Sequence, residues 1–192
     1  MKVIAIMGSP RLTGNTNYLV DQALGEVATR GFETEKIALV QHRVNPCLGH
    51  EDCASFSACK QSDDAPWILE KFSSAEGVIL GSPVYYYNVT AQMKAFIDRN
   101  YFLYTHERLL RAFCAGLIVI SGGGGTEHTV GALRRFLKLS ADIPDDRIIT
   151  LTGHANKLGE VKSNLALVNK ARELGRQIAE ILASLHSSPR TN

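Results

Sequence analysis

The sequence predicts an α/β protein, an open and doubly wound sheet of five parallel strands with helices on both faces. Short apolar runs alternate along the chain with longer segments whose apolar residues recur at helical spacing. Polar loops rich in glycine follow three of these runs, as loops do at the carboxyl ends of parallel strands. Parallel neighbours need crossover connections, and right-handed crossovers place helices on both faces of the sheet.

The first unit of this pattern is a strand, a loop and a helix. A strand is expected over residues 2–7, because an unbroken apolar run suits a strand that is buried on both faces. Apolar residues then recur at helical spacing from Leu19 to Val27, and Gly31 is expected to end that helix. The second strand is expected over residues 35–40.

The middle of the chain repeats the pattern. Asp64 and Pro66 predict the start of a helix over residues 67–72, and the third strand is expected over residues 77–81. The next helix is indicated by an apolar stripe at helical spacing, formed by Val89, Met93, Phe96 and Ile97.

The last part of the chain predicts two more strands, over residues 113–121 and 147–152, with a helix after each. The first of these helices has the apolar stripe Val130, Leu133 and Leu137. The second is a long helix with the stripe Val161, Leu165, Val168, Leu174, Ile178, Ile181 and Leu185.

Composition limits the function classes. The 192 residues, 45% of them hydrophobic and 21% charged, suit one domain, expected over residues 1–186 and followed by a polar tail at 187–192. A net charge of +2 without a basic run argues against nucleic-acid binding. Apolar stretches are too short for a membrane span or a signal peptide, so we expect a cytoplasmic protein that binds no membrane.

The loop "GSPRLTGNTN" after the first strand has the parts of a phosphate site. Ser9, Asn15 and Thr16 supply polar groups, Arg11 supplies a positive charge, and Gly14 allows a turn just before a helix begins. The loop lacks the lysine of a P-loop, and it lacks the G-x-G-x-x-G fingerprint of a tightly bound dinucleotide. The motif therefore predicts a phosphate group outside both of these nucleotide motifs.

Two further loops are expected at the same sheet edge. "GSPVYYYN" after the third strand offers consecutive tyrosines, which provide a flat surface for a planar ring or cover a hydrophobic edge. "SGGGGTEH" after the fourth strand presents backbone with few side chains, which suits close approach of a ligand or a flexible hinge. Three such loops at one edge favour a ligand site over ordinary surface loops.

The first two loop motifs together resemble the NADPH-dependent FMN reductase family of flavodoxin-like proteins, and more closely its iron-sulfur flavoprotein branch. The resemblance covers about the first 125 residues, and it implies strand order 2-1-3-4-5, noncovalently bound FMN, NAD(P)H as reductant, and a homodimer or homotetramer. The residues that it implies for FMN are Ser9, Arg11, Gly14, Asn15, Thr16, Asn17, Pro83, Val84, Tyr85, Tyr86, Asn88, Ser121, Gly122, Gly123, Gly124 and Gly125.

The cysteine segment "NPCLGHEDCASFSACK" departs from that branch. It places Cys47, His50, Cys53 and Cys59 at spacing C-x2-H-x2-C-x5-C, where the branch has four cysteines. Three interpretations remain: a vestigial site without metal, an iron-sulfur cluster with His50 as a ligand, or a structural zinc site. The fourth cysteine, Cys114, lies inside an expected strand and is interpreted as a buried apolar residue.

The resemblance implies that the flavin carries the chemistry, so no acid-base pair is required. His128 is a weak candidate for contact with the ring or a substrate, and a solvent-facing position is the plainer expectation. Three functions follow: a flavin or quinone-type reductase, an electron carrier between protein partners, and a flavin-binding module without turnover. The expected partner is a small-molecule electron acceptor or a redox protein. The segment "NYFLYTHERLL" is expected to form a lid or a subunit interface.

Overall fold

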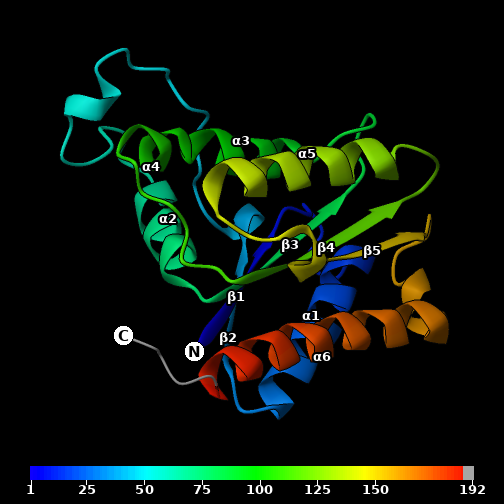
Figure 1. The fold of residues 1–192 in the computed structure, drawn as a ribbon. Helices are drawn as coiled ribbons and strands as arrows, with labels where there is room; N and C mark the ends of the chain where they lie inside the picture. The colour runs from blue at the N-terminus through cyan, green and yellow to red at the C-terminus, as the bar shows by residue number, and fades with distance from the viewer. Residues whose placement is uncertain (188–192) are drawn as a thin grey trace.

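The computed structural model describes residues 1–187 and has a five-stranded parallel sheet at its centre (Figure 1). Its strand order is β2-β1-β3-β4-β5, so the predicted fold class and order are confirmed. The expected polar tail lies outside the described residues except for Ser187, which ends the last helix. The strands are β1 (Lys2–Met7), β2 (Glu33–Ala38), β3 (Gly77–Pro83), β4 (Cys114–Ser121) and β5 (Ile148–His154).

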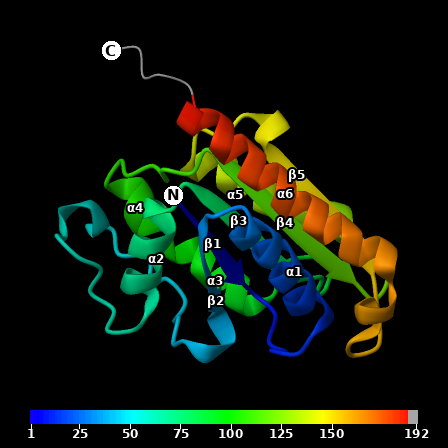
Figure 2. The same ribbon diagram turned by 90° about the horizontal axis from the view of Figure 1, so that it is seen from below.

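Helices cover both faces of this sheet. Figures 1 and 2 show two of them side by side on one face, while the others lie on the opposite face. The first pair is α1 (Asn15–Thr29) and α6 (Leu165–Ser187); the others are α2 (Ala65–Ser74), α3 (Ala91–Arg99), α4 (Tyr101–Thr105) and α5 (Thr126–Ser140). Among residues 1–187, the helices fall short of the length and apolar character that crossing a bilayer requires.

Alternation along the strands divides the core into two apolar layers. In β1, Ile4 and Ile6 pack toward α2, α3 and α5, whereas Val3, Ala5 and Met7 pack toward α1 and α6. Successive side chains of a strand point to opposite faces, so a central strand must be apolar at every position. This explains why the apolar run is unbroken from Val3 to Met7.

Strand ends differ from the predictions by one to two residues. The second strand is Glu33–Ala38, because its register pairs Lys2 with Glu33 and Met7 with Ala38; the expected residues 39–40 instead begin a 3-10 turn. The third strand extends to Pro83 and the fifth to His154, because both continue to pair with β4. Phe113 precedes the fourth strand, and Arg147 belongs to a 3-10 turn.

The long last helix was predicted to start too early. Val161 lies in a separate 3-10 turn (Glu160–Ser163), and Asn164 separates that turn from α6. The carboxamide Oδ1 of Asn164 accepts a hydrogen bond from the N–H of Leu167 at 3.1 Å, as an N-cap does. Leu165, predicted to be part of the buried stripe, is therefore in the first turn of α6 and is 69% exposed.

Other helix ends agree better with the sequence. Gly31 follows α1 with φ of 84°, a left-handed conformation that suits glycine after a helix. Asp64 is the residue before α2, as predicted. Val89, however, precedes α3, because Thr90 is its N-cap and accepts a hydrogen bond from the N–H of Met93 at 3.3 Å.

Candidate functional site

The loop between β1 and α1 is ordered by its own polar groups. The N–H of Arg11 donates to the Ser9 hydroxyl at 3.1 Å, and the N–H of Gly14 donates to the Arg11 carbonyl at 3.0 Å. A Cβ at position 14 would lie 3.0 Å from that carbonyl oxygen, so the turn leaves little room for a side chain. The loop thus delivers the amino end of α1, where backbone N–H groups lack helical partners.

Two asparagines hold this loop in place. Asn15 donates from Nδ2 to the Lys157 carbonyl at 2.8 Å and accepts from the N–H of Val161 at 3.4 Å, so it connects α1 to the segment after β5. Asn17 is buried, and its Nδ2 donates to the Leu12 carbonyl, while its Oδ1 has no hydrogen-bond partner in the part of the chain that the structure describes. Asn17 therefore supports the loop from within, whereas Asn15 ties it to the segment after β5.

The loop after β3 forms a tight hairpin. Tyr85 and Asn88 exchange backbone hydrogen bonds of 2.9 and 3.0 Å, and the N–H of Val84 donates to the Ile120 carbonyl at 2.9 Å, which fixes the base of the hairpin to β4. Tyr86 and Tyr87 occupy the tip with φ of 47° and 61°. Two consecutive positive φ values identify the two-residue turn of type I′.

The glycine loop after β4 lies against this hairpin. The Ser121 hydroxyl donates to the Gly123 carbonyl at 2.8 Å, which orders the turn before α5. Gly125 has φ of 89°, and a Cβ there would lie 2.8 Å from the Cα of Tyr87, so this position requires glycine on two grounds. Close packing of hairpin and glycine loop explains this part of the glycine run.

These loops enclose two cavities at the carboxyl ends of the strands. The first cavity lies at the switch point between β1 and β3 and has a volume of about 170 Å³; we name it the loop cavity. It contains predicted residues from all three loops, as expected where strand order reverses. They are Ser9, Arg11, Gly14, Asn15, Thr16, Pro83, Val84, Tyr85 and Gly122.

The second cavity, which we name the hairpin cavity, lies between the hairpin and the glycine loop and has a volume of about 220 Å³. It is lined by Val84, Tyr86, Tyr87, Ser121, Gly122, Gly123 and Gly124. Val84 and Gly122 line both cavities, so the two spaces adjoin. Three predicted residues, Asn17, Asn88 and Gly125, belong to these loops but are not among the residues that line either cavity.

A fourth loop, which follows β5, was not predicted from the sequence. Ala155, Asn156 and Leu158 line the loop cavity, and the N–H of Ala155 donates to the Ser121 carbonyl at 2.9 Å. The Glu160 carboxylate accepts from the N–H groups of Asn156 and Lys157 at 2.7 and 2.8 Å, and these bonds hold the pKa of Glu160 below its usual value. The sequence "GHANKLGE" could have indicated this loop, because it contains glycine and asparagine and follows a parallel strand whose carboxyl end lies at the same sheet edge as the other three loops.

The predicted metal ligands are not brought together. Within residues 1–187, no three His, Cys, Asp or Glu side chains are grouped so that they could hold a metal ion. Each cysteine sulfur of the segment instead accepts a different contact: Cys47 from the N–H of Gly49 at 3.5 Å, Cys53 from the Thr105 hydroxyl at 3.7 Å, and Cys59 from Arg99 at 3.2 Å. In this arrangement the four residues do not fit an iron-sulfur cluster or a zinc ion.

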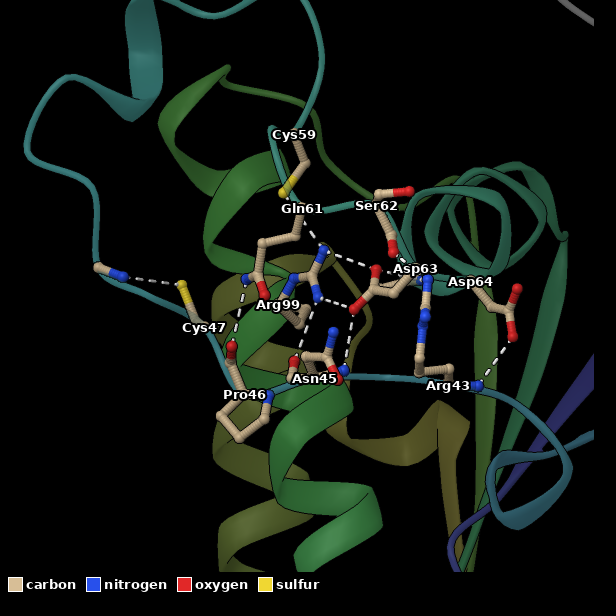
Figure 3. Close-up of polar contacts among 12 residues, drawn as sticks. Arg43, Asn45, Pro46, Cys47, Cys59, Gln61, Ser62, Asp63, Asp64 and Arg99 are labelled. Carbon is tan, nitrogen blue, oxygen red and sulfur yellow. Dashed lines mark hydrogen bonds and ion pairs between the residues drawn. The ribbon is translucent and has the colours of Figure 1, made fainter.

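A buried ion pair holds the ends of the cysteine segment (Figure 3). The side chains of Arg99 and Asp63 are 1% and 0% exposed, and two hydrogen bonds of 2.5 and 3.1 Å join them. Arg99 also donates to the Asn45 carbonyl at 3.1 Å, while Asp63 accepts from the N–H groups of Asn45 and Ala65 at 2.9 and 3.2 Å. Asn45 and Asp63, on either side of the segment, are thus tied to α3.

Two further expectations concern single side chains. His128 is 67% exposed on α5, pairs with Glu127 at 3.5 Å, and lies edge-on to Tyr87 with 6.2 Å between ring centroids. Cys114 is fully buried in β4, as predicted, and burial raises the pKa of its thiol to about 12. The plainer expectation for each residue is therefore confirmed.

Comparison with known proteins adds a family. The sequence profile described as NADPH-dependent FMN reductase matches residues 1–146. The chain is 38% identical over 189 residues to an iron-sulfur flavoprotein of Methanocaldococcus jannaschii, covering 95% of this chain and 97% of that protein. It is also 37% identical over 187 residues to an iron-sulfur flavoprotein of Archaeoglobus fulgidus, with 96% and 81% covered.

Solved structures share the fold at lower identity. An NAD(P)H:quinone oxidoreductase from Methanothermobacter marburgensis superposes with a TM-score of 0.74 at 13% identity, covering 93% of this chain and 96% of that one. RosB, crystallised with a bound formylriboflavin 5'-phosphate intermediate, also has a TM-score of 0.74, at 19% identity and with 100% and 82% covered. At 13% and 19% identity, these similarities establish a shared fold and no more than that.

Proposed function

The chain belongs to the NADPH-dependent FMN reductase family, and on that premise we propose that it holds the phosphate end of FMN in the loop cavity and passes electrons from NAD(P)H to an acceptor. It is an FMN-dependent oxidoreductase, and the reaction type that we favour is reduction of a flavin or a quinone. Structural neighbours with this fold include proteins named as quinone oxidoreductases and azoreductases.

The observation that carries this proposal is the wall of the loop cavity. Arg11 and the amino end of α1 meet there, which places a positive charge beside backbone N–H groups without helical partners. Such a pairing suits a phosphate dianion. Gly14 adds the required space, because a side chain at that position would press against the loop backbone. The residues present therefore fit the phosphate end of FMN.

The other residues would orient the ring. Tyr85 lines the loop cavity, and Val84 and Gly122 line both cavities; a Cβ on Gly122 would lie 2.3 Å from Asn156 Oδ1, so this wall is closed by backbone without a side chain. When bound, FMN supplies the atom that accepts and donates hydride. The chain itself supplies a pocket built from four loops, and backbone N–H groups of the glycine loop suit negative charge on a reduced ring.

This proposal is tested by the spectrum of the purified protein and by one charge removal. We expect flavin absorbance that bleaches when NADPH is added without oxygen. Arg11→Ala should weaken FMN binding about 10- to 100-fold, the range for a hydrogen bond to a charged group. Arg172→Ala is the control, because Arg172 is exposed on α6 and, among residues 1–187, hydrogen-bonds only to Gln22. Equal FMN affinity in both variants would contradict the phosphate assignment.

A second candidate function is electron transfer between protein partners, favoured by the names of the relatives from M. jannaschii and A. fulgidus. In this chain the cysteine segment lies beside α4, away from the carboxyl ends of the strands (Figures 1 and 2). Iron and acid-labile sulfide in anaerobically purified protein, in proportion to chain, would favour this candidate. Flavin bands without iron or sulfide would favour the reductase.

We further propose a homodimer or homotetramer in the cytoplasm, with a small-molecule acceptor or a redox protein as partner. Support for the oligomer comes from a cavity of about 490 Å³ between α4, the 107–110 segment and α5, at whose edge Leu109 and Leu139 are 63% and 71% exposed. Four unpaired cysteines suit a reducing compartment. Light scattering of the purified protein measures the oligomer.

A further inference from the structure

The cysteine segment does not fit a metal, and its three free thiols differ in how they are held. Cys53 is buried against α4, where its sulfur accepts from a threonine hydroxyl of that helix. Cys47 and Cys59 are only half-buried, and their sulfurs accept from the N–H of Gly49 at 3.5 Å and from Arg99 at 3.2 Å. Cys47 and Cys59 are thus the two thiols of the segment that a reagent can reach.

Hydrogen bonds join the chain that enters the segment to the chain that leaves it, and the two arms run in opposite directions. The N–H of Asn45 donates to the Asp63 carboxylate at 2.9 Å. One step farther out, Gln61 Nε2 donates to the Pro46 carbonyl at 3.1 Å. The next facing positions carry the two half-buried cysteines, which Figure 3 shows on opposite arms.

A single guanidinium brings one of these sulfurs to the opposite arm. Arg99 donates to the Asn45 carbonyl at 3.1 Å and to Cys59 Sγ at 3.2 Å. The sulfur of Cys59 therefore lies near a point two residues before Cys47. A disulfide, which joins Cα atoms about 4.4 to 6.8 Å apart, would replace the present contacts of the two sulfurs. Arg99 would keep its bonds to Asp63, so its buried charge would stay compensated.

Cys59 also has room for a reagent beside it. It lines a cavity of about 240 Å³ between the cysteine segment, α2 and α4, whereas Cys47 is not among the lining residues. Glu70 and Arg108 line the same cavity and offer charges of both signs. A small disulfide that carries carboxylate and ammonium groups, such as glutathione disulfide, suits this cavity.

We propose that Cys59 and Cys47 form a thiol–disulfide exchange site for a low-molecular-weight disulfide. Cys59 bonds to one sulfur of the reagent, whose S–S bond breaks and releases a first thiol. Cys47 then bonds to Cys59, and the second thiol leaves. Two protein thiols and one disulfide thus become one protein disulfide and two small thiols, a transfer of two electrons in which both protons pass to the released thiols. The site lies outside the loop cavity and goes beyond the proposed function.

The test uses the full-length protein with its flavin, reduced and then freed of reductant, and glutathione disulfide as the reagent. The denatured chain should show two free thiols after the reaction instead of four before it. With those thiols alkylated, cleavage by trypsin and after Glu51 separates residues 44–51, which hold Cys47, from residues 52–60, which hold the other two cysteines. The two peptides should stay joined in the mass spectrum until a reductant is added.

Serine variants separate the roles of the two thiols. Cys47→Ser should stop the reaction at the mixed disulfide and so retain one glutathione on Cys59. Cys59→Ser should lose both the adduct and the joined peptides, because Cys47 does not line the cavity. Cys53→Ser is the matched control and should form the same disulfide as the wild type.

Three results would overturn the proposal. Glutathione on both thiols without an internal disulfide would show that the arms do not close. Joined peptides that persist in Cys59→Ser would assign the bond to Cys53. Iron and acid-labile sulfide in proportion to chain would show that the thiols hold a cluster. Failure of the proposed function is read separately, because the thiols should react in this way whether or not NADPH bleaches the flavin.

Discussion

At the scale of single residues, the ion pair of Arg99 and Asp63 is the most deeply buried charge interaction that the structure describes. Burial alone raises the pKa of Asp63, but the hydrogen bonds from Arg99 and from the Asn45 backbone outweigh it, so the pKa lies below the ordinary value of 3.8. Removing one partner of such a pair leaves the other charge buried without compensation.

Asp63→Asn should therefore lower the free energy of unfolding by about 3 to 5 kcal/mol at pH 7. The matched control is Asp98→Asn, whose partner Lys94 is 58% exposed, and which should cost less than about 1 kcal/mol. Urea titrations of both variants and the wild type measure the difference. A loss for Asp63→Asn no larger than the control would show that the pair contributes little.

Acid should remove the same contribution from the wild type. Because the pKa of Asp63 is lower in the folded state than in the unfolded state, its stabilisation is complete above the ordinary value near 3.8 and is lost as pH falls below that value toward the folded pKa. The gap in unfolding free energy between wild type and Asp63→Asn should therefore narrow between pH 5 and pH 3. A gap that stays constant would contradict the assignment.

Neither this pair nor the strained tip could be predicted from the sequence. Arg99 and Asp63 are 36 positions apart, and their contact depends on how α3 packs beside the cysteine segment. Tyr86 was predicted as part of the site from its motif, but its positive φ runs against the preference of its residue type. Residue-level chemistry is readable from the sequence, whereas residue-level geometry depends on tertiary packing.

At the scale of elements, α1 and α6 pack closely because of one glycine. A Cβ on Gly175 of α6 would lie 2.2 Å from the Ala23 carbonyl oxygen of α1, and backbone cannot yield as a flexible side chain does. Gly175→Ala should lower the free energy of unfolding by about 1 to 3 kcal/mol, the range for overpacking a core. Chemical denaturation measures this loss.

Gly25 of α1 offers the reverse control within the same pair of helices. It is exposed, and a Cβ there would meet no atom within 4 Å, so only helix propensity changes. Gly25→Ala should therefore stabilise the protein by about 0.5 to 1 kcal/mol. If Gly175→Ala and Gly25→Ala changed the free energy of unfolding equally, the contact between α1 and α6 would not explain the effect of Gly175→Ala.

Element prediction succeeded where the apolar period was regular and failed at the ends. The run at residues 2–7 was predicted with its observed bounds because β1 lies between β2 and β3 and is buried from Val3 to Met7. The last helix was extended back to Val161, since a buried residue of a 3-10 turn matches the same period. The loop after β5 was not predicted to be part of the site, although β5 ends at the same sheet edge as the strands before the three predicted loops.

At the scale of the whole molecule, the site depends on four loops from distant parts of the sequence. Asn15 connects α1 to the segment after β5, Val84 connects the hairpin to β4, and Ala155 connects β5 to the glycine loop. The strand order could be predicted, and it brings these loops together. A ligand that fills the loop cavity should consequently stabilise the entire chain.

FMN should therefore raise the unfolding midpoint of the protein depleted of flavin. At one hundred times its Kd, a ligand specific for the folded state adds about 2.7 kcal/mol, which corresponds to about 5 to 10 °C for a chain of this length. Riboflavin, which has the same ring without the phosphate, should give a clearly smaller shift at equal concentration, because it cannot use Arg11 and the amino end of α1. Arg11→Ala should reduce the difference between the two ligands, whereas equal shifts in the wild type would mean that the phosphate binds elsewhere.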